Sequence, residues 1–239
     1  MVYFTGDIHG SPWGIKRFCE RAKLTEDDIV VLLGDVGLNY FCDKRDDNAK
    51  SVLAGLKPSF LCIHGNHEMR PWHIDSYMIK PWKGGQIWMQ EQYPNLLFAR
   101  DGEIFFIDGL NYLVIGGAYS VDKNYRLANG YGWWEDEQPS DEIKAFVEQQ
   151  IIDRSIDVVL SHTCPYRYEP KETFLLFIDQ STVEKSTELW LDTIEKKLDY
   201  KAWYCGHWHI DKLVDKMHFL FHSFESAEDF KGTIKENHI

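Results

Sequence analysis

Short apolar stretches recur along the chain and end in small residues that are followed by aspartate, asparagine or histidine. Apolar runs of this length predict buried strands, here over residues 1–4, 28–33 and 60–63. Between these strands, residues 13–22 and 48–56 are expected to form helices. The resulting β-α-β-α-β order predicts a parallel sheet with helices on its faces.

Two helices have start signals in the sequence. Ser11 is expected to be the N-cap of the first helix, with Pro12 at its first helical position. Ser140 is followed by two acidic residues and is expected to cap a helix that reaches about residue 155.

The middle of the chain predicts antiparallel pairing. Three apolar segments, 96–100, 104–107 and 112–115, are separated by Asp101-Gly102 and Asp108-Gly109. An Asp-Gly pair between apolar runs is typical of a β-hairpin. Together with the parallel first part, this pattern predicts a mixed sheet or two packed sheets.

The last third continues the alternation of strands and helices. Strands are expected at 158–161 and 202–205, with a helix at 187–198 between them. Two short strands, 212–214 and 218–222, are expected to follow.

With 239 residues, the chain is expected to form one domain spanning 1–239. Three irregular insertions interrupt the pattern, near 70–95, 118–139 and 165–185, and a loosely held tail is expected over 225–239. Long loops inside a compact domain tend to be functional.

The charge balance limits the possible partners. The chain has 26 Lys and Arg against 38 Asp and Glu, and its net charge is −12. This balance weighs against extended nucleic acid, which requires a basic face to neutralise phosphates. A phosphorylated small substrate remains compatible with it, because bound metal ions can dominate the local field.

The cysteines and the apolar runs predict a cytoplasmic protein. The five cysteines are widely spaced and form no C-x-x-C pair, which favours reduced thiols. We expect neither a leader peptide nor a membrane-spanning segment, because no apolar run approaches the required length.

Seven residues with metal-binding chemistry follow five of the predicted strands. They are Asp7, His9, Asp35, Asn66, His162, His207 and His209. The carboxyl ends of strands in a doubly wound sheet form the crevice where ligands bind. Imidazole, carboxylate and amide oxygen suit ions such as Zn, Mn, Fe, Ni or Co. Seven such residues suit two ions, and two ions about 3.5–4 Å apart are typical of phosphate-ester hydrolysis.

The order of these motifs resembles that of the calcineurin-like metallophosphoesterases. The motifs are Gly6-Asp7-Ile8-His9-Gly10, Gly34-Asp35, Gly65-Asn66-His67-Glu68, Ser161-His162 and Gly206-His207-Trp208-His209. The resemblance spans positions 7–209 and implies an α/β fold of mixed α+β character. Its expected architecture is a four-layer αββα sandwich of two mixed β-sheets flanked by helices.

The resemblance also implies roles for single residues. Two metal ions, drawn from Mn, Fe and Zn, would be held by two groups of three residues, with Asp35 bridging them. The first group is Asp7, His9 and His209, and the second is Asn66, His162 and His207. His67 would be the catalytic histidine that contacts the phosphate and protonates the leaving oxygen. The implied activity is hydrolysis of a phosphomonoester or phosphodiester by hydroxide that bridges the two metals.

The sequence departs from the family at one motif. Members that act as protein Ser/Thr phosphatases carry Asp-Arg a few residues beyond the bridging aspartate, where this chain has Leu38-Asn39. A protein-phosphatase activity is therefore not expected. Arg126 or Arg70 is a candidate for binding the substrate phosphate instead.

Two alternatives to this function remain open from the sequence. The aromatic loop 119–134 could stack bases, which would suit a nuclease or a cyclic-nucleotide phosphodiesterase acting on a nucleotide-type substrate. The second alternative is a non-catalytic protein-interaction scaffold on the same fold, with the insertions as partner surfaces.

Overall fold

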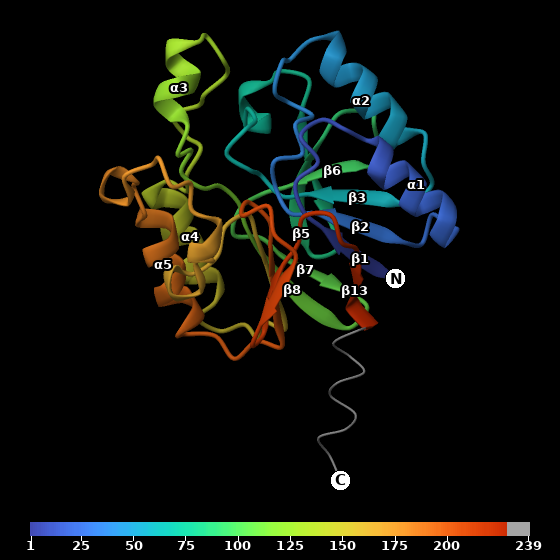
Figure 1. The fold of residues 1–239 in the computed structure, drawn as a ribbon. Coiled ribbons are helices and arrows are strands. Elements are labelled where there is room, and N and C mark those ends of the chain that lie inside the picture. Colours follow the sequence, from blue (N-terminus) through green and yellow to red (C-terminus); the bar gives the residue numbers. More distant parts are fainter. Residues whose placement is uncertain (229–239) are drawn as a thin grey trace.

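Two mixed β-sheets pack face to face and are flanked by helices, in the computed structural model, which describes residues 1–228. Figure 1 shows α1 and α2 on the outside of one sheet and α4 and α5 on the outside of the other. The predicted two-sheet sandwich is therefore confirmed.

The first sheet has seven strands in the order β13-β1-β2-β3-β6-β5-β4. Its parallel centre consists of β1 (Val2–Thr5), β2 (Ile29–Leu32), β3 (Ser59–Cys62) and β6 (Leu96–Ala99). Its antiparallel edges are β4 (Met78–Trp82), β5 (Gly85–Met89) and β13 (Glu225–Ser226).

The second sheet has six strands in the order β11-β12-β10-β9-β8-β7. Four of them are parallel neighbours: β8 (Leu110–Ile115), β9 (Val158–Ser161), β10 (Ala202–Cys205) and β12 (Met217–Phe219). The antiparallel edges are β7 (Ile104–Ile107) and β11 (Lys212–Val214).

The central strands are apolar throughout because both of their faces are covered. On β2, Val31 belongs to the core between the sheets, whereas Val30 packs under α1 (Trp13–Ala22) and α2 (Lys44–Ala54). The second sheet is covered in the same way by α4 (Asp141–Gln150) and α5 (Ser186–Glu195). Continuous apolar runs are typical of such doubly covered strands.

The hairpin β4–β5 lies in a region for which the sequence predicted an irregular loop, so that part of the prediction is wrong. The strand β4 is an edge strand whose residues are half-buried or exposed, and it contains Pro81. An exposed edge strand shows no apolar alternation, and proline is tolerated there. Lys83 and Gly84 form the turn with positive φ angles of 48° and 90°.

Of the two Asp-Gly pairs, only one closes a hairpin among the described residues. Asp108-Gly109 joins β7 and β8 as predicted. The prediction for Asp101-Gly102 is wrong, because the chain crosses there from the first sheet to the second. The Asp101 carboxylate holds this corner by accepting a hydrogen bond from Gly116 N at 2.7 Å.

The helix starts agree with the sequence in part. Ser140 caps α4 and accepts a hydrogen bond from Ile143 N, as predicted. Ser11 is not the cap of α1, because Pro12 takes that position without a side-chain bond. The second helix begins earlier than expected, at Lys44, because Asp43 caps it.

The insertions contain short elements. The loop 118–139 includes α3 (Lys123–Ala128), and the insertion 165–185 includes three 3₁₀ turns, Tyr166–Tyr168, Lys171–Thr173 and Gln180–Thr182. The expected tail is held at its start, where β13 pairs with β1, and its residues 229–239 lie outside the described part. None of the helices within 1–228 combines the length and the apolar character that crossing a bilayer requires.

Glu188 anchors α5 to the loop after β9. Its carboxylate is buried and accepts a hydrogen bond from the Thr163 hydroxyl at 2.9 Å. Burial raises the pKa of Glu188 from 4.5 to about 7. The folded protein therefore holds this proton more tightly than the unfolded chain does.

We predict that Glu188→Gln removes a pH dependence of stability. In the wild type, the free energy of unfolding should fall as pH rises from about 4.5 to about 7, because the unfolded chain releases the proton first. The free energy of unfolding of the variant should exceed that of the wild type by up to about 3 kcal/mol above pH 7 and by almost nothing at pH 4.5. Urea unfolding across this range measures the difference, with the exposed Glu135→Gln as control. A difference that does not change with pH would contradict the prediction.

Candidate metal centre

The seven predicted ligands lie together at the carboxyl ends of five strands. These strands are β1, β2 and β3 of the first sheet and β9 and β10 of the second. The residues that follow them are Asp7, His9, Asp35, Asn66, His162, His207 and His209. The site therefore straddles the edge at which both sheets end.

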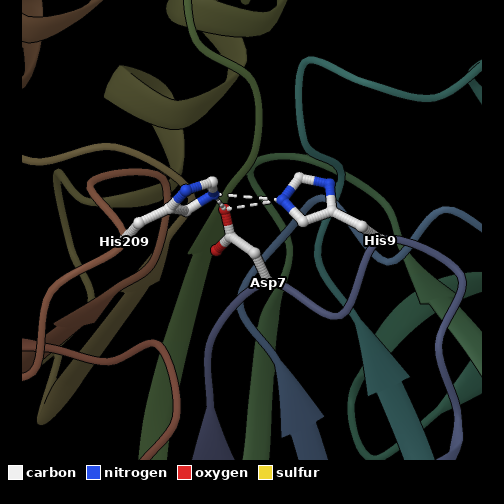
Figure 2. Close-up of side chains that lie close together, drawn as sticks. All are labelled: Asp7, His9 and His209. Atoms are coloured by element: carbon white, nitrogen blue, oxygen red, sulfur yellow. Dashed lines mark hydrogen bonds and ion pairs between the residues drawn. The ribbon is translucent and has the colours of Figure 1, made fainter. Parts of the chain in front are cut away.

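Asp7, His9 and His209 form the first group (Figure 2). The Nε2 atoms of His9 and His209 face each other at 3.0 Å. Asp7 Oδ2 lies 3.2 Å from Nε2 of His209 and 4.0 Å from Nε2 of His9. This oxygen is buried and has no hydrogen-bond partner, whereas Asp7 Oδ1 accepts a bond from His207 N. An orphaned buried carboxylate oxygen between two imidazole nitrogens fits a cation.

Asn66, His162 and His207 form the second group. His162 Nδ1 lies 2.8 Å from the Leu33 carbonyl, which can only accept, so Nδ1 carries the proton. In the neutral ring, His162 Nε2 then points a lone pair at Asn66 Oδ1, 2.8 Å away. Nδ1 of His207 lies 3.1 Å from the same oxygen. Two acceptors at 2.8 Å repel each other unless a cation or a proton lies between them.

Asp35 lies between the two groups. Its Oδ1 accepts hydrogen bonds from the backbone N–H groups of Asn66 and His67 at 2.8 Å and lies 3.5 Å from Nε2 of His162. Ligand atoms of Asp35 also come within 4.8 Å of those of His9 and Asp7. This carboxylate is therefore placed to contact ions in both groups.

The electrostatics keep most of these groups in a ligating form. Burial lowers the pKa values of His207 and His9, which keeps their rings neutral. Burial would raise the pKa of Asp35, but the nearby His162, His67 and His9 outweigh it and lower that pKa. The Asp7 carboxylate beside its ring raises the pKa of His209.

Four of the candidate ligands have positive φ angles, which residues other than glycine rarely adopt. The φ angles of His9, Asp35, His207 and His209 are 45°, 44°, 64° and 50°. Such strain costs on the order of 1–3 kcal/mol per residue and is concentrated at functional sites.

Two glycines make room for the carboxylates. A Cβ on Gly65 would overlap the backbone nitrogen and the carboxylate of Asp35, and a Cβ on Gly206 would overlap the carboxylate of Asp7. The glycines of these motifs therefore serve close packing against the ligands.

Three supporting residues were not predicted from the sequence. Ser120 Oγ donates to Glu137 at 2.5 Å and accepts from Asn66 Nδ2 at 2.8 Å, which fixes the amide with its oxygen toward the histidines. Glu68 is buried and accepts hydrogen bonds from Val36 N and Gly65 N, which ties the two loops together. The signal in the sequence was weak, because Ser120 and Glu137 lie in a loop without periodicity.

His67 lies beside the ligands and has a carboxylate partner that the sequence did not reveal. His67 Nδ1 is 3.6 Å from Asp35 Oδ2, and His67 Nε2 is 3.6 Å from Asp122 Oδ1. The other oxygen of Asp122 is 3.5 Å from Nε of Arg126. The expected site residue Arg126 thus lies near His67, and both line a cavity of about 450 Å³ on the α2 side.

Arg70 does not lie at the centre, in contrast to its expected role. Its side chain is buried, and its guanidinium donates to Asp101 at 2.5 Å and to the Asp136 carbonyl at 2.7 Å. These contacts hold the crossing between the two sheets, and Arg70 does not line the cavity of His67 and Arg126.

The aromatic loop contributes one aromatic side chain to a second cavity at the site, of about 430 Å³, on the side of the insertion 165–185. Tyr119 lines that cavity, whereas Tyr125 and Tyr131 are exposed and contact each other, with ring centroids 6.0 Å apart.

Comparison with known proteins gives one family match. A family model described as Calcineurin-like phosphoesterase matches residues 1–211. No curated protein matches the chain.

Two solved structures share the fold. Phosphopantetheinyl hydrolase (PptH) from Mycobacterium tuberculosis superposes with a TM-score of 0.50 at 15% identity, covering 92% of this chain and 87% of that chain. TT1561 of Thermus thermophilus gives a TM-score of 0.52 at 13% identity, with the same coverage of 92% and 87%. At these identities, the two structures show a common fold alone.

We predict that Gly65→Ala impairs metal binding and lowers stability, because the added Cβ meets both the carboxylate and the backbone of Asp35. The added methyl group displaces Asp35, so Mn²⁺ affinity should fall at least about tenfold. Titration calorimetry and metal analysis after dialysis measure this loss, and circular dichroism reports the fold. Gly14→Ala is the matched control, because nothing lies within 4 Å of its Cβ. Equal Mn²⁺ affinities for the two variants would refute the prediction.

Proposed function

The chain belongs to the calcineurin-like phosphoesterase family and is a hydrolase of phosphate esters, and from this premise we propose that its reaction depends on two metal ions. The observation that supports this most is the convergence of seven donor side chains from five strand ends. The substrate we propose is a phosphorylated small molecule, a phosphomonoester or phosphodiester.

We propose that the two groups described above each hold one ion. Asp7, His9 and His209 would hold the first, and Asn66, His162 and His207 the second, with Asp35 between them. When bound, such ions neutralise charge on the phosphoryl oxygens and lower the pKa of a water that attacks phosphorus. Mn, Fe and Zn all suit this mixture of nitrogen and oxygen donors.

His67 is proposed to protonate the leaving oxygen. It borders both cavities at the site, so its ring can reach a group bound on either side. Asp122 would orient the ring and support its positive charge, and Arg126 in turn holds Asp122. General acid catalysis of this kind is worth about 10²–10⁴ in rate.

We also propose that the chain forms a single domain and is located in the cytoplasm. The two sheets share one core between them, which supports a single domain. All five cysteines are free, which supports a reducing cytoplasm as the location.

We predict that the protein loaded with Mn²⁺ hydrolyses 4-nitrophenyl phosphate or bis(4-nitrophenyl) phosphate. Asp35→Asn should reduce kcat/KM at least about 100-fold, and His67→Ala should reduce it about 10²–10⁴-fold for phenyl esters and less for nitrophenyl esters, whose leaving group needs little protonation. Release of nitrophenolate measures the rate. The control is His73→Ala, an exposed histidine paired with Asp136 away from the site. If neither ester turns over with Mn²⁺, Fe²⁺ or Zn²⁺, the proposed activity is wrong.

A second prediction concerns Asp122 as a positioning residue. In Asp122→Asn, the ring of His67 loses its carboxylate, so the loss should grow as the leaving group becomes more basic. We expect a loss of about 10-fold or more for phenyl esters and less than about 3-fold for 4-nitrophenyl esters. The dependence of kcat on the pKa of the leaving phenol measures this, with the exposed Asp153→Asn as control. A uniform loss across leaving groups would assign Asp122 a merely structural role.

A further inference from the structure

A cavity of about 430 Å³ opens at the candidate metal centre on the side of the insertion 165–185. Asp35, Asn66, His207 and His209 form its inner end. Ligand cavities typically measure about 300–1,000 Å³, so this one has room for a small organic group attached to a phosphate at the centre.

The outer wall of this cavity is apolar. Phe174, Leu175, Ile178 and Val183 contribute to it from the insertion. Phe174 stacks on Trp208 with ring centroids 5.9 Å apart, which joins the insertion to the ligand loop after β10. The insertion therefore adds an apolar surface directly beside the proposed reacting phosphate.

The charges around this wall disfavour a second anion. The acidic residues Glu169 and Glu184 line the cavity together with Glu188, whose raised pKa keeps it partly protonated at neutral pH, and Lys185 is the cation among the lining residues. Nζ of Lys185 lies 2.8 Å from both carboxylate oxygens of Glu169, so its charge is already neutralised. A further phosphate or a carboxylate on the substrate would meet a wall of net negative charge.

The neighbouring cavity differs in this respect. Arg45 and Arg126 line it, together with Asp46, the two histidines His9 and His67, and the aromatic side chains of Tyr40 and Phe41. The two cavities therefore differ in charge: the α2 side presents two guanidinium groups, whereas the cation on the side of the insertion is paired with Glu169.

We infer that the substrate carries an uncharged, apolar organic group on its phosphate and that this group binds between the insertion and Trp208. The inference rests on the proposed function, because it places the phosphate at the metal centre. It disfavours nucleoside di- and triphosphates and short carboxylated phosphoesters as substrates.

Binding of alkylphosphonates tests the inference separately from turnover. These compounds keep the anionic head and resist hydrolysis, so calorimetric titration of the Mn²⁺-loaded protein reports affinity alone. From methyl- to hexylphosphonate, Kd should fall roughly two- to fourfold per methylene, as expected for burial of apolar area. A terminal carboxylate on the hexyl chain should abolish this gain.

Two variants locate the effect. Ile178→Ser and Phe174→Ser should each reduce the ratio of the Kd for methylphosphonate to the Kd for hexylphosphonate at least about fivefold. Leu176→Ser is the matched control, because Leu176 lies in the same segment but is fully exposed and does not line the cavity. This control should keep the wild-type ratio.

The outcomes separate the two proposals. Phosphonate binding that does not depend on chain length overturns the inference, even where 4-nitrophenyl esters are hydrolysed. Chain-length dependence that survives in both Ser variants places the apolar group elsewhere and also overturns it. Chain-length dependence in a protein that hydrolyses no ester supports the apolar site and counts against the proposed function alone.

Discussion

The structure depends on the gathering of lone pairs at one edge of two sheets. Nε2 of His9 faces Nε2 of His209, and Nε2 of His162 faces Asn66 Oδ1, at 3.0 and 2.8 Å. Such pairs repel unless a cation or a proton satisfies them, and at the buried pair of His162 and Asn66 no water is available to do so. The fold therefore holds these atoms in an arrangement that is favourable only when a cation or a proton lies between them. Left-handed backbone at four of the ligands adds to the cost that bound ions would offset.

The two-sheet architecture explains how one chain can hold this arrangement. Parallel strands end at the same edge of a sheet, so the loops after β1, β2 and β3 reach one side of the site. The loops after β9 and β10 reach it from the other sheet. The core between the sheets fixes both edges relative to each other, and Gly65 and Gly206 allow the last approach. Packing far from the site thus controls distances within it.

The sequence predicted those parts of the molecule that repeat a local pattern. Buried strands such as β2 are apolar throughout, and the ligands follow them directly, so both could be expected. The residues of the edge strand β4 are half-buried at best, so its sequence gave no pattern. Asp101-Gly102 has the composition of a hairpin turn, but tertiary packing uses it as a crossing between sheets. Ser120 and Asp122 gain their roles only because their loop folds over the site, which no local signal encodes.

The packing of Leu38 and Asn39 explains why this chain departs from the protein-phosphatase motif at these two positions. Both residues are buried, and Asn39 Oδ1 accepts a hydrogen bond from the Tyr77 hydroxyl, so this position belongs to the core. The carboxylate that faces Nε2 of His67 comes from Asp122, in the loop 118–139. This loop also places Tyr119 and Val121 in the wall of the apolar cavity. Because one segment orients the proposed acid and also shapes the cavity, a change in its conformation alters both at once. In the mechanism we propose, substrate choice and proton transfer are therefore coupled.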